Sequence, residues 1–486
     1  MINRPFLLSL VSATLLLLAA CGGDGAATTM SPSPRGLPED PQALMTTALF
    51  TTFRDITATV DMPPNPAAAM KMGESGDERY IPVLIDMLGF PWLLDDSTEA
   101  AILESLSSLS GVPLSDENRN WIWWVEWLSA NEDVSLPDGY AIWKGNLFTT
   151  YVDSRIGSFL IDAVEPGIRL EEVVWGGVVR DGIPDLQDPP TIPASGAAYL
   201  NPNDRVFGIT VAGESRAYPL RILNAHEMAN DVVGGTPIAL AYCTLCGSGI
   251  AYVAEINGEQ TTFGTSGLLY RANKLMYDRL TDTLWIQFAG TPVIGPLQEP
   301  DFRLQTVPLT LTTWADWRSL HPDTTVLDID TGVYPAGAYR SENDPESQYY
   351  EYRANDGSIF PLHKRSDLLP EKSLVAGINL AGRAKAYPLD LLEGAGLVND
   401  VVGGVEIVVL SDGGRAYERD GVTFVNPGTT NDGIILTDDE GVEWRLTEEA
   451  LVSIEESSRV LNRIESRIVY WFAWFQFHPA SEVYED

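Results

Sequence analysis

The sequence predicts an α+β protein in which an α-helical section comes first and a β-rich α+β domain, built from an internal duplication, follows. Two observations support this prediction. Apolar residues recur at helical spacing in residues 42–164, whereas later segments alternate between apolar and polar side chains. Several motifs of the second part also occur twice, most of them at one constant separation. A chain of 486 residues is long enough for roughly two or three domains.

Residues 1–20 have the features of a secretory signal peptide. Arg4 is the only charged residue there, and an apolar run extends from Phe6 to Ala20. This run is shorter than the roughly twenty residues that cross a bilayer. Its end, Leu18-Ala19-Ala20-Cys21, resembles the lipobox of bacterial lipoproteins. We therefore expect lipidation of Cys21 and anchoring of the mature chain to a membrane, facing the extracytoplasmic side of the cell envelope.

Residues 21–41 are rich in Gly, Ala, Ser, Thr and Pro, a composition typical of a flexible tether. The whole chain has a formal net charge of −37, from 68 acidic and 31 basic residues. Nucleic-acid binding needs a basic surface, so we expect no nucleic-acid partner. The negative net charge also disfavours adsorption of the protein to anionic lipid. The acyl chains on Cys21 are therefore the expected means of attachment to the membrane.

Residues 42–164 are expected to form the helical domain. One helix is predicted between Tyr80 and Leu88, and a second one from its candidate N-cap Asp96 to Gly111. A third predicted helix contains Trp121, Trp123, Trp124 and Trp127. We expect these tryptophans to pack in the core and against neighbouring elements, with a ligand platform as the alternative. The short amphipathic segments loosely resemble helical hairpins of the HEAT type.

The β-rich part, residues 165–486, contains two copies of one unit, at about 200–328 and 370–486. Most matching motifs are 169 positions apart, and a Trp-x-x-Trp-x-x-x-His-Pro motif recurs after 157 positions. The matching pairs include Ala217-Tyr218-Pro219-Leu220 with Ala386-Tyr387-Pro388-Leu389, and Asn230-Asp231-Val232-Val233 with Asn399-Asp400-Val401-Val402. The longer middle of the first copy accounts for the difference in separation.

Each copy is predicted to consist mainly of strands. In the first copy, strands are expected at 206–211, 217–220 and 237–242, with a short helix from Arg221 to Asp231 between the second and third strands. A proline inside the returning strand, Pro219, suggests that this strand lies at the edge of its sheet.

Residues common to both copies are expected to serve the fold. His321 and His478 belong to the repeated Trp-x-x-Trp-x-x-x-His-Pro motif, which favours a structural role for both. Residues found in one copy only are better candidates for chemistry, and Cys243, Cys246 and His226 are of this kind. The second copy has Asp412, Arg415 and Ala395 at the corresponding positions.

With Cys21 acylated, Cys243 and Cys246 are the only free thiols of the mature chain. Their Cys-x-x-Cys spacing allows three interpretations. The first is a catalytic redox pair, with Cys243 as the attacking or exposed thiol, Cys246 as the resolving thiol and His226 as a proton-transfer partner. The second is a copper or zinc site that uses both thiolates with His226 and Met276. The third is a structural disulfide, which for so short a ring contributes only about 2 kcal/mol.

Other motifs of this part favour structural roles. A strand is predicted directly after the cysteines, where thioredoxin-like proteins have a helix, so full thioredoxin homology is not expected. The Gly- and Ser-rich segment 261–270 lacks the spacing of a phosphate-binding loop. Ser266 lacks a nucleophile-elbow pattern, which argues against a hydrolase. Asp278 and Arg279 are expected to form an ion pair that locks a turn, with a catalytic role as the alternative.

About two-thirds of the chain, residues 165–486, resembles a bacterial family catalogued as domain of unknown function 3179. The resemblance rests on segments that occur in the same order: Asp181-Gly182-Ile183-Pro184, Ala217-Tyr218-Pro219-Leu220 with Asn230-Asp231, Cys243-Thr244-Leu245-Cys246-Gly247, Phe263–Tyr270, Met276–Arg279 with Thr281, and Leu284–Gln287. No activity is established for the family. Some members carry selenocysteine in the cysteine motif, so the resemblance implies redox chemistry there.

The sequence thus predicts a membrane-anchored extracytoplasmic protein with a thiol–disulfide redox function and an envelope protein as partner or electron donor. Two alternatives stay open. One is an envelope lipoprotein that handles copper or zinc. The other is a non-catalytic binding or scaffold lipoprotein whose helical section is the interaction surface.

Overall fold

The computed structural model describes residues 66–161, 166–297, 301–430 and 433–485. The predicted signal peptide, Cys21, the tether and the start of the helical section lie outside the described residues. In the part of the chain that is described, none of the helices combines the length and apolar character needed to cross a membrane.

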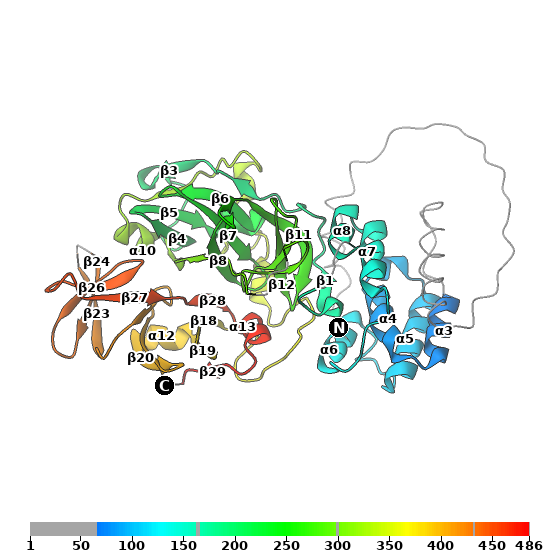
Figure 1. Cartoon of the computed structure of the whole chain (residues 1–486). Coiled ribbons are helices and arrows are strands. Elements are labelled where there is room, and N and C mark those ends of the chain that lie inside the picture. The colour runs from blue at the N-terminus through cyan, green and yellow to red at the C-terminus, as the bar shows by residue number, and fades with distance from the viewer. Residues whose placement is uncertain (1–65, 162–165, 298–300, 431–432, 486) are drawn as a thin grey trace.

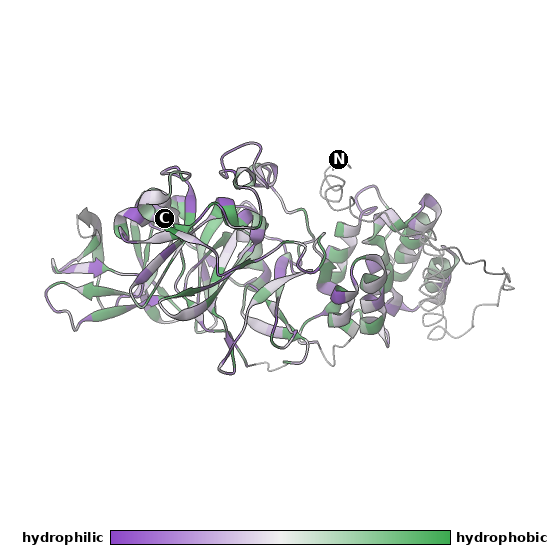
Figure 2. Ribbon diagram, turned by 90° about the horizontal axis from the view of Figure 1, so that it is seen from above, coloured by the Kyte–Doolittle hydropathy of each residue, from purple (hydrophilic) through white to green (hydrophobic). Residues whose placement is uncertain are grey.

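Helices come first and strands follow, which confirms the prediction of an α+β protein. The helical section lies at one end of the molecule and the β-rich part at the other (Figures 1 and 2). The elements of the helical section are α3 (Pro66–Ser75), η1 (Glu78–Tyr80), α4 (Ile81–Leu88), η2 (Pro91–Leu93), α5 (Asp96–Ser110), α6 (Trp121–Ala130), α7 (Tyr140–Tyr151) and α8 (Ser154–Ile161).

Two details of the helical section bear on the sequence-based predictions. The N-cap of α5 is Asp95 rather than Asp96, because the Asp95 carboxylate accepts a hydrogen bond from the backbone N–H of Thr98 at 2.7 Å. Of the four tryptophans of α6, Trp124 is completely buried, and the other three are partly buried against the same core.

A buried ion pair joins α4 and α7, with Lys144 Nζ 2.9 Å from Asp86 Oδ1.

The first copy, together with three short strands that precede it, forms three five-stranded sheets, with strand orders β16-β4-β5-β17-β3, β15-β8-β7-β6-β2 and β1-β11-β12-β13-β14. Their strands are β1 (Val173–Trp175), β2 (Leu186–Gln187), β3 (Thr191–Pro193), β4 (Arg205–Val211), β5 (Glu214–Pro219), β6 (Met228–Val233), β7 (Thr236–Cys243), β8 (Ser248–Val253), β11 (Phe263–Tyr270), β12 (Asn273–Asp278), β13 (Leu284–Ile286), β14 (Thr291–Ile294), β15 (Thr306–Val307), β16 (Thr310–Thr313) and β17 (Thr325–Leu327). The other elements are η3 (Leu170–Glu172), η4 (Ala194–Gly196), the β9–β10 hairpin (Glu255–Ile256 and Glu259–Gln260), α9 (Leu220–His226) and α10 (Trp314–Leu320).

The second copy forms a sheet of strand order β28-β18-β19-β29 and a longer one of order β20-β21-β22-β27-β26-β25-β24-β23. Between the copies lie η5 (Ala336–Ala338) and α11 (Tyr350–Ala354). The elements that follow are β18 (Leu374–Leu380), β19 (Arg383–Pro388), α12 (Leu389–Ala395), β20 (Leu397–Val402), β21 (Val405–Leu410), β22 (Ala416–Glu418), β23 (Phe424–Thr430), β24 (Gly433–Asp438), β25 (Glu443–Leu446), β26 (Ala450–Ser453), β27 (Val460–Ile464), β28 (Arg467–Tyr470), α13 (Trp471–Phe477) and β29 (Glu482–Val483).

The repeated motifs make the same contacts in both copies. The first hairpin of each copy approaches the tryptophan of the following helix so closely that only glycine fits. A Cβ added to Gly208 would lie 2.2 Å from the Trp317 ring, and one added to Gly377 would lie 2.3 Å from the Trp474 ring. The repeated sequence motifs therefore correspond to one packing arrangement that occurs twice.

Two predictions about the first copy are wrong. The expected helix from Arg221 to Asp231 ends at His226, because Glu227 has a left-handed backbone with φ of 56°, and Asp231 lies in strand β6. Strand β5 is not at an edge, since it lies between β4 and β17. Pro219 is tolerated there because it is the last residue of β5 and lies beyond the residues that pair with β17.

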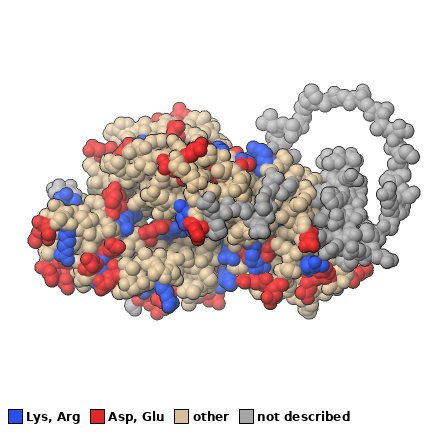
Figure 3. All heavy atoms as spheres, viewed as in Figure 1, with Lys and Arg blue, Asp and Glu red and all other residues tan. Residues whose placement is uncertain are grey.

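The surface agrees with the acidic composition. Figure 3 shows acidic side chains spread over the visible face, with basic side chains in small groups among them.

Candidate functional site

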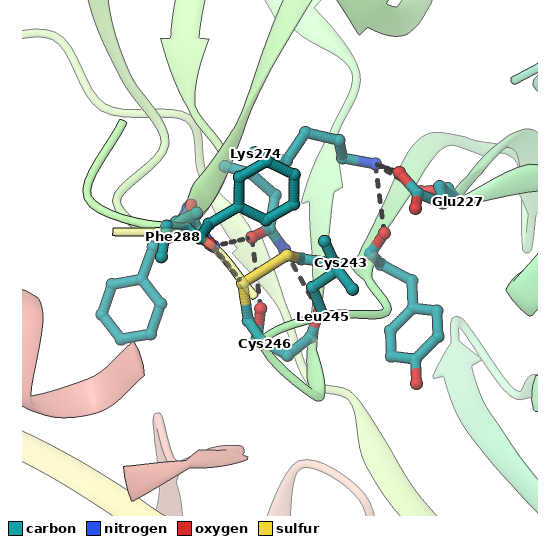
Figure 4. The surroundings of a disulfide bond; sticks show 12 residues. Glu227, Cys243, Leu245, Cys246, Lys274 and Phe288 are labelled. Carbon is teal, nitrogen blue, oxygen red and sulfur yellow. Dashed lines mark hydrogen bonds and ion pairs between the residues drawn. A yellow bond between two sulfur atoms is a disulfide. The ribbon is translucent and has the colours of Figure 1, made fainter. Parts of the chain in front are cut away.

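Cys243 and Cys246 form a disulfide at the end of strand β7. Their Cα atoms are 5.3 Å apart, and the backbone N–H of Cys246 donates to the carbonyl oxygen of Cys243 at 3.1 Å. Gly247 follows with φ of 63°, and strand β8 begins at Ser248. The motif thus lies in a tight turn between two antiparallel strands, as the strand predicted after the cysteines requires (Figure 4).

Both sulfur-bearing side chains are buried. Cys243 is 3 % exposed and Cys246 is 0 % exposed, so the expectation that Cys243 is an exposed thiol is wrong for this oxidised form. Leu245 is the one residue of the four-residue motif that is partly exposed. An external thiol therefore reaches either sulfur only after the loop or the residues that cover it have moved.

A network of buried amides surrounds Cys246. The Nδ2 group of Asn273 lies 3.5 Å from the Cys246 sulfur and donates to Gln287 Oε1 at 2.8 Å. Gln287 Nε2 in turn donates to the carbonyl oxygen of Ala241 on β7 at 3.0 Å. Asn273 is 1 % exposed and Gln287 is 0 % exposed. These amides fix the strands on both sides of the disulfide and place a hydrogen-bond donor beside one sulfur.

A buried ion pair lies at the backbone of Tyr242, the residue before Cys243. Lys274 Nζ is 3.7 Å from Glu227 Oε2 and donates to the carbonyl oxygens of Glu227 at 2.7 Å and of Tyr242 at 3.1 Å. In Figure 4 the Lys274 side chain extends to the Glu227 carboxylate, to the right of the disulfide in this view. Burial lowers the pKa of Lys274 and raises the pKa of Glu227, and the attraction between the two charges opposes both shifts.

The cysteine loop is covered by the second copy and by the segment between the copies. The backbone N–H of Tyr470 donates to the carbonyl oxygen of Cys246 at 2.9 Å, and the hydroxyl of Tyr352 on α11 donates to that of Leu245 at 2.7 Å. Tyr470 also forms part of the wall of a cavity of about 680 Å³. Its charged lining residues include Arg205, Glu342, Arg353 and Lys372. A polar cavity thus adjoins the loop through Tyr470.

The corresponding loop of the second copy contains a closed network of charges instead of a disulfide. Arg415 replaces Cys246 and pairs with Glu448 at 2.8 Å and with Asp412. Burial alone would raise the pKa of Glu448, but Arg415, His321 and Arg463 outweigh it and hold this pKa well below the ordinary range. The contact of His321 with Glu448, at 3.2 Å, agrees with the structural role expected for this histidine.

The other sequence-predicted site residues are not gathered at the disulfide. The ring nitrogens of His226 lie 2.6 Å from the carbonyl oxygen of Pro184 and 2.7 Å from the hydroxyl of Tyr339, and burial lowers its pKa. Met276 is buried in the middle of β12. In the described part of the chain, no group of three or more His, Cys, Asp or Glu side chains is placed to hold a metal ion. The candidate ligand set for copper or zinc is therefore not brought together.

Asp278 and Arg279 do not form the expected ion pair. Asp278 Oδ2 accepts a hydrogen bond from the indole of Trp285 at 2.8 Å, whereas Arg279 pairs with Asp181 at 3.0 Å and Asp185 at 2.7 Å. Asp278 is the last residue of β12 and Arg279 follows it, so their side chains point in different directions. These contacts hold the Asp181-Gly182-Ile183-Pro184 segment against β12.

Sequence comparison of the copies missed Glu227 and Lys274. Glu227 could have been found, because the separation of 169 positions that exposed His226 also aligns Glu227 with Gly396. Lys274 lies beyond the insertion in the first copy, where the alignment of the copies is lost. Only the matching contacts of Asp278 with Trp285 and of Asp438 with Trp444 show that Lys274 corresponds to Ile434.

The fold and the site define the class of protein: an α+β protein whose duplicated β-rich part contains a buried Cys-x-x-Cys disulfide in one copy only. The chain belongs to the family described as protein of unknown function (DUF3179), whose model matches residues 180–481. The helical section precedes the matched residues. No curated protein and no solved structure matches the chain.

Proposed function

We propose that the protein is a thiol–disulfide oxidoreductase that uses Cys243 and Cys246. The observation that supports this proposal is that the disulfide and its polar surroundings belong to one copy of the duplicated unit. The other copy reaches a similar fold with Arg415 and an ion network at that place. A shared fold does not need the cysteines, so their presence in the first copy has another reason.

The reaction is an exchange with a protein dithiol. A thiolate of the partner attacks one sulfur of the disulfide, the bond between Cys243 and Cys246 breaks, and a mixed disulfide forms. The second partner thiol then loses its proton and attacks the mixed disulfide. The partner leaves with a new disulfide, and Cys243 and Cys246 keep two electrons and take up two protons as thiols. The reverse sequence oxidises a substrate dithiol.

The proposal includes the place of the reaction. The signal-like residues 1–20 and the lipobox-like segment that ends at Cys21 support a lipid-anchored protein on the extracytoplasmic side of the cell envelope. Protein thiols tend to become oxidised there, so a membrane-tethered dithiol would meet partners of both oxidation states.

A second candidate is a non-catalytic binding or scaffold lipoprotein in which the disulfide is a structural link. The burial of both sulfurs favours it, because reactive cysteines are ordinarily at least partly exposed. In this case the helical section would be the interaction surface.

A redox titration of the full-length protein in detergent separates the two candidates. The purified chain is equilibrated in dithiol buffers of graded potential, alkylated and weighed by mass spectrometry. The proposed oxidoreductase is expected to be reduced reversibly between about −120 and −270 mV, the range of known exchange enzymes. A pair that stays oxidised below about −300 mV behaves as a structural disulfide and contradicts the proposal.

A further inference from the structure

The buried ion pair near the disulfide contacts the backbone of Tyr242, the residue before Cys243. Lys274 Nζ donates to the carbonyl oxygen of Tyr242, the residue before Cys243, at 3.1 Å. The hydroxyl of Thr244, the residue after Cys243, is near the Glu227 carboxylate but forms no hydrogen bond with it. Glu227 also accepts a hydrogen bond from the backbone N–H of Tyr242 at 2.9 Å through its carbonyl oxygen. The two charges are thus held at the backbone of the cysteine loop from β12 and from the end of α9.

Such a pair is costly to keep in a protein core. Lys274 is 2 % exposed and Glu227 is 8 % exposed, and the removal of either charge from water opposes folding. The second copy shows that the fold does without it, since Gly396 and Ile434 stand at the corresponding positions. The pair therefore occurs where the disulfide occurs and is absent where the disulfide is absent.

We propose that Lys274 and Glu227 are positioning residues of the cysteine pair, and that their opposite charges set the equilibrium between its oxidised and reduced forms. This inference rests on the proposed redox function. Neither side chain is required to touch the reacting sulfur, since the charges act through the loop backbone and through the field at Cys243.

The direction of each effect follows from the charge that reduction creates. Breaking the disulfide bond with two electrons leaves sulfurs that are thiolates until they take up protons. The ammonium group of Lys274 stabilises a thiolate on Cys243, and the carboxylate of Glu227 destabilises it. Replacing Lys274 by a neutral residue should therefore disfavour the reduced form, and replacing Glu227 by a neutral residue should favour it.

Two other ionisable groups among the described residues interact with this pair through their charges. Asp185 acts on Lys274 by its charge, and Glu227 acts on the buried phenol of Tyr349. Arg279 holds Asp185 in an ion pair at 2.7 Å, which reduces the influence of this carboxylate. The balance at Cys243 thus depends mainly on Lys274 and Glu227 themselves.

Two shape-preserving variants of the full-length protein, Lys274→Met and Glu227→Gln, test the inference. The equilibrium constant for exchange with a reference dithiol is measured by alkylation and mass spectrometry at about pH 9.5, above the ordinary cysteine pKa of about 8.5, where the reduced Cys243 is largely a thiolate. We expect Lys274→Met to shift it about tenfold toward the oxidised form and Glu227→Gln about tenfold toward the reduced form, each equivalent to about 30 mV. The pKa of the reduced pair, from the pH dependence of alkylation, should rise in the first variant and fall in the second.

The double variant and a matched control complete the design. Combining both changes should return the constant close to that of the wild type, because the two neighbouring effects oppose each other. Lys144→Met removes the cation of a comparable buried pair in the helical section and should leave the constant unchanged. It shows what the loss of a buried ion pair does by destabilisation alone.

Shifts in the same direction, or no shift, in the two single variants would overturn the inference, because a purely structural pair affects both forms through the same loss of packing. A wild-type disulfide that is not reduced reversibly would overturn the proposed function instead. The two failures are therefore distinguishable in one set of titrations.

Discussion

Tyr352→Phe is expected to speed up reduction of the disulfide without a change at either cysteine. The Tyr352 hydroxyl donates to the carbonyl oxygen of Leu245 at 2.7 Å, and the tyrosine is 4 % exposed. Phenylalanine keeps the ring and its packing against Lys372, whose Nζ lies 3.5 Å from the ring centre. The substitution therefore removes one hydrogen bond that α11 makes to the cysteine loop.

The size of the rate increase follows from the burial of the sulfurs and from the strength of the lost hydrogen bond. A small thiol attacks only the minor population of molecules in which the loop is open, because Cys243 and Cys246 are 3 % and 0 % exposed. A hydrogen bond of this kind contributes about 1 kcal/mol to the closed form. Its loss should raise the open population, and with it the reduction rate, by about fivefold.

The assay is the rate of reduction by excess dithiothreitol, followed by alkylation at timed intervals. Tyr417→Phe is the matched control, because its hydroxyl donates to the carbonyl oxygen of Thr447 at 2.8 Å in the second copy, away from the cysteine loop. An unchanged rate in Tyr352→Phe would refute the reasoning. Equal acceleration in both variants would show that reduction proceeds through unfolding of the whole domain rather than through opening of the loop.

Three further changes are expected to alter stability, each measured by urea unfolding. Gly377→Ala should lower the free energy of unfolding by about 1–3 kcal/mol, because the new Cβ would overlap the Trp474 ring. Trp124→Ala should lower it by about 3–5 kcal/mol in the helical section, as expected for a tryptophan with a core role. Arg415→Met should lower it by about 3 kcal/mol at pH 7, because Glu448 loses a buried partner. The lowered pKa of Glu448 stabilises the folded state above about pH 4.3, the ordinary glutamate pKa. This stabilisation is lost as the pH falls below that value. Arg415→Met should therefore lose less stability than the wild type on acidification.

Each of these changes has an outcome that contradicts its explanation. Gly337→Ala meets no atom within 4 Å and should be neutral, so an equal loss in this variant would argue against overlap as the cause in Gly377→Ala. Trp124→Ala with unchanged stability would revive the ligand-platform interpretation. A parallel loss of stability on acidification in Arg415→Met and the wild type would exclude Glu448 as the source of the pH dependence.

The sequence by itself determined the order of helices and strands, the duplication and the position of the cysteine turn. These features depend on local periodicity and on repeated motifs, which can be recognised without long-range contacts. The buried tryptophan of α6 and the strand after the cysteines follow from the same kind of pattern. The wrong helix end at Asp231 arose because a left-handed residue such as Glu227 has no clear sequence signal when it is not glycine.

Only the tertiary structure decided which side chains meet at the disulfide. His226 was placed there by its absence from the second copy, yet it lies with Pro184 and Tyr339. Lys274, by contrast, comes from a strand about thirty residues away and reaches the loop because the two sheets that contain β7 and β12 pack together. Contacts between sheets depend on how those sheets are stacked, and this has no counterpart in sequence spacing. For that reason the sequence identified the two cysteines, and the packing of the sheets identified the charges beside them.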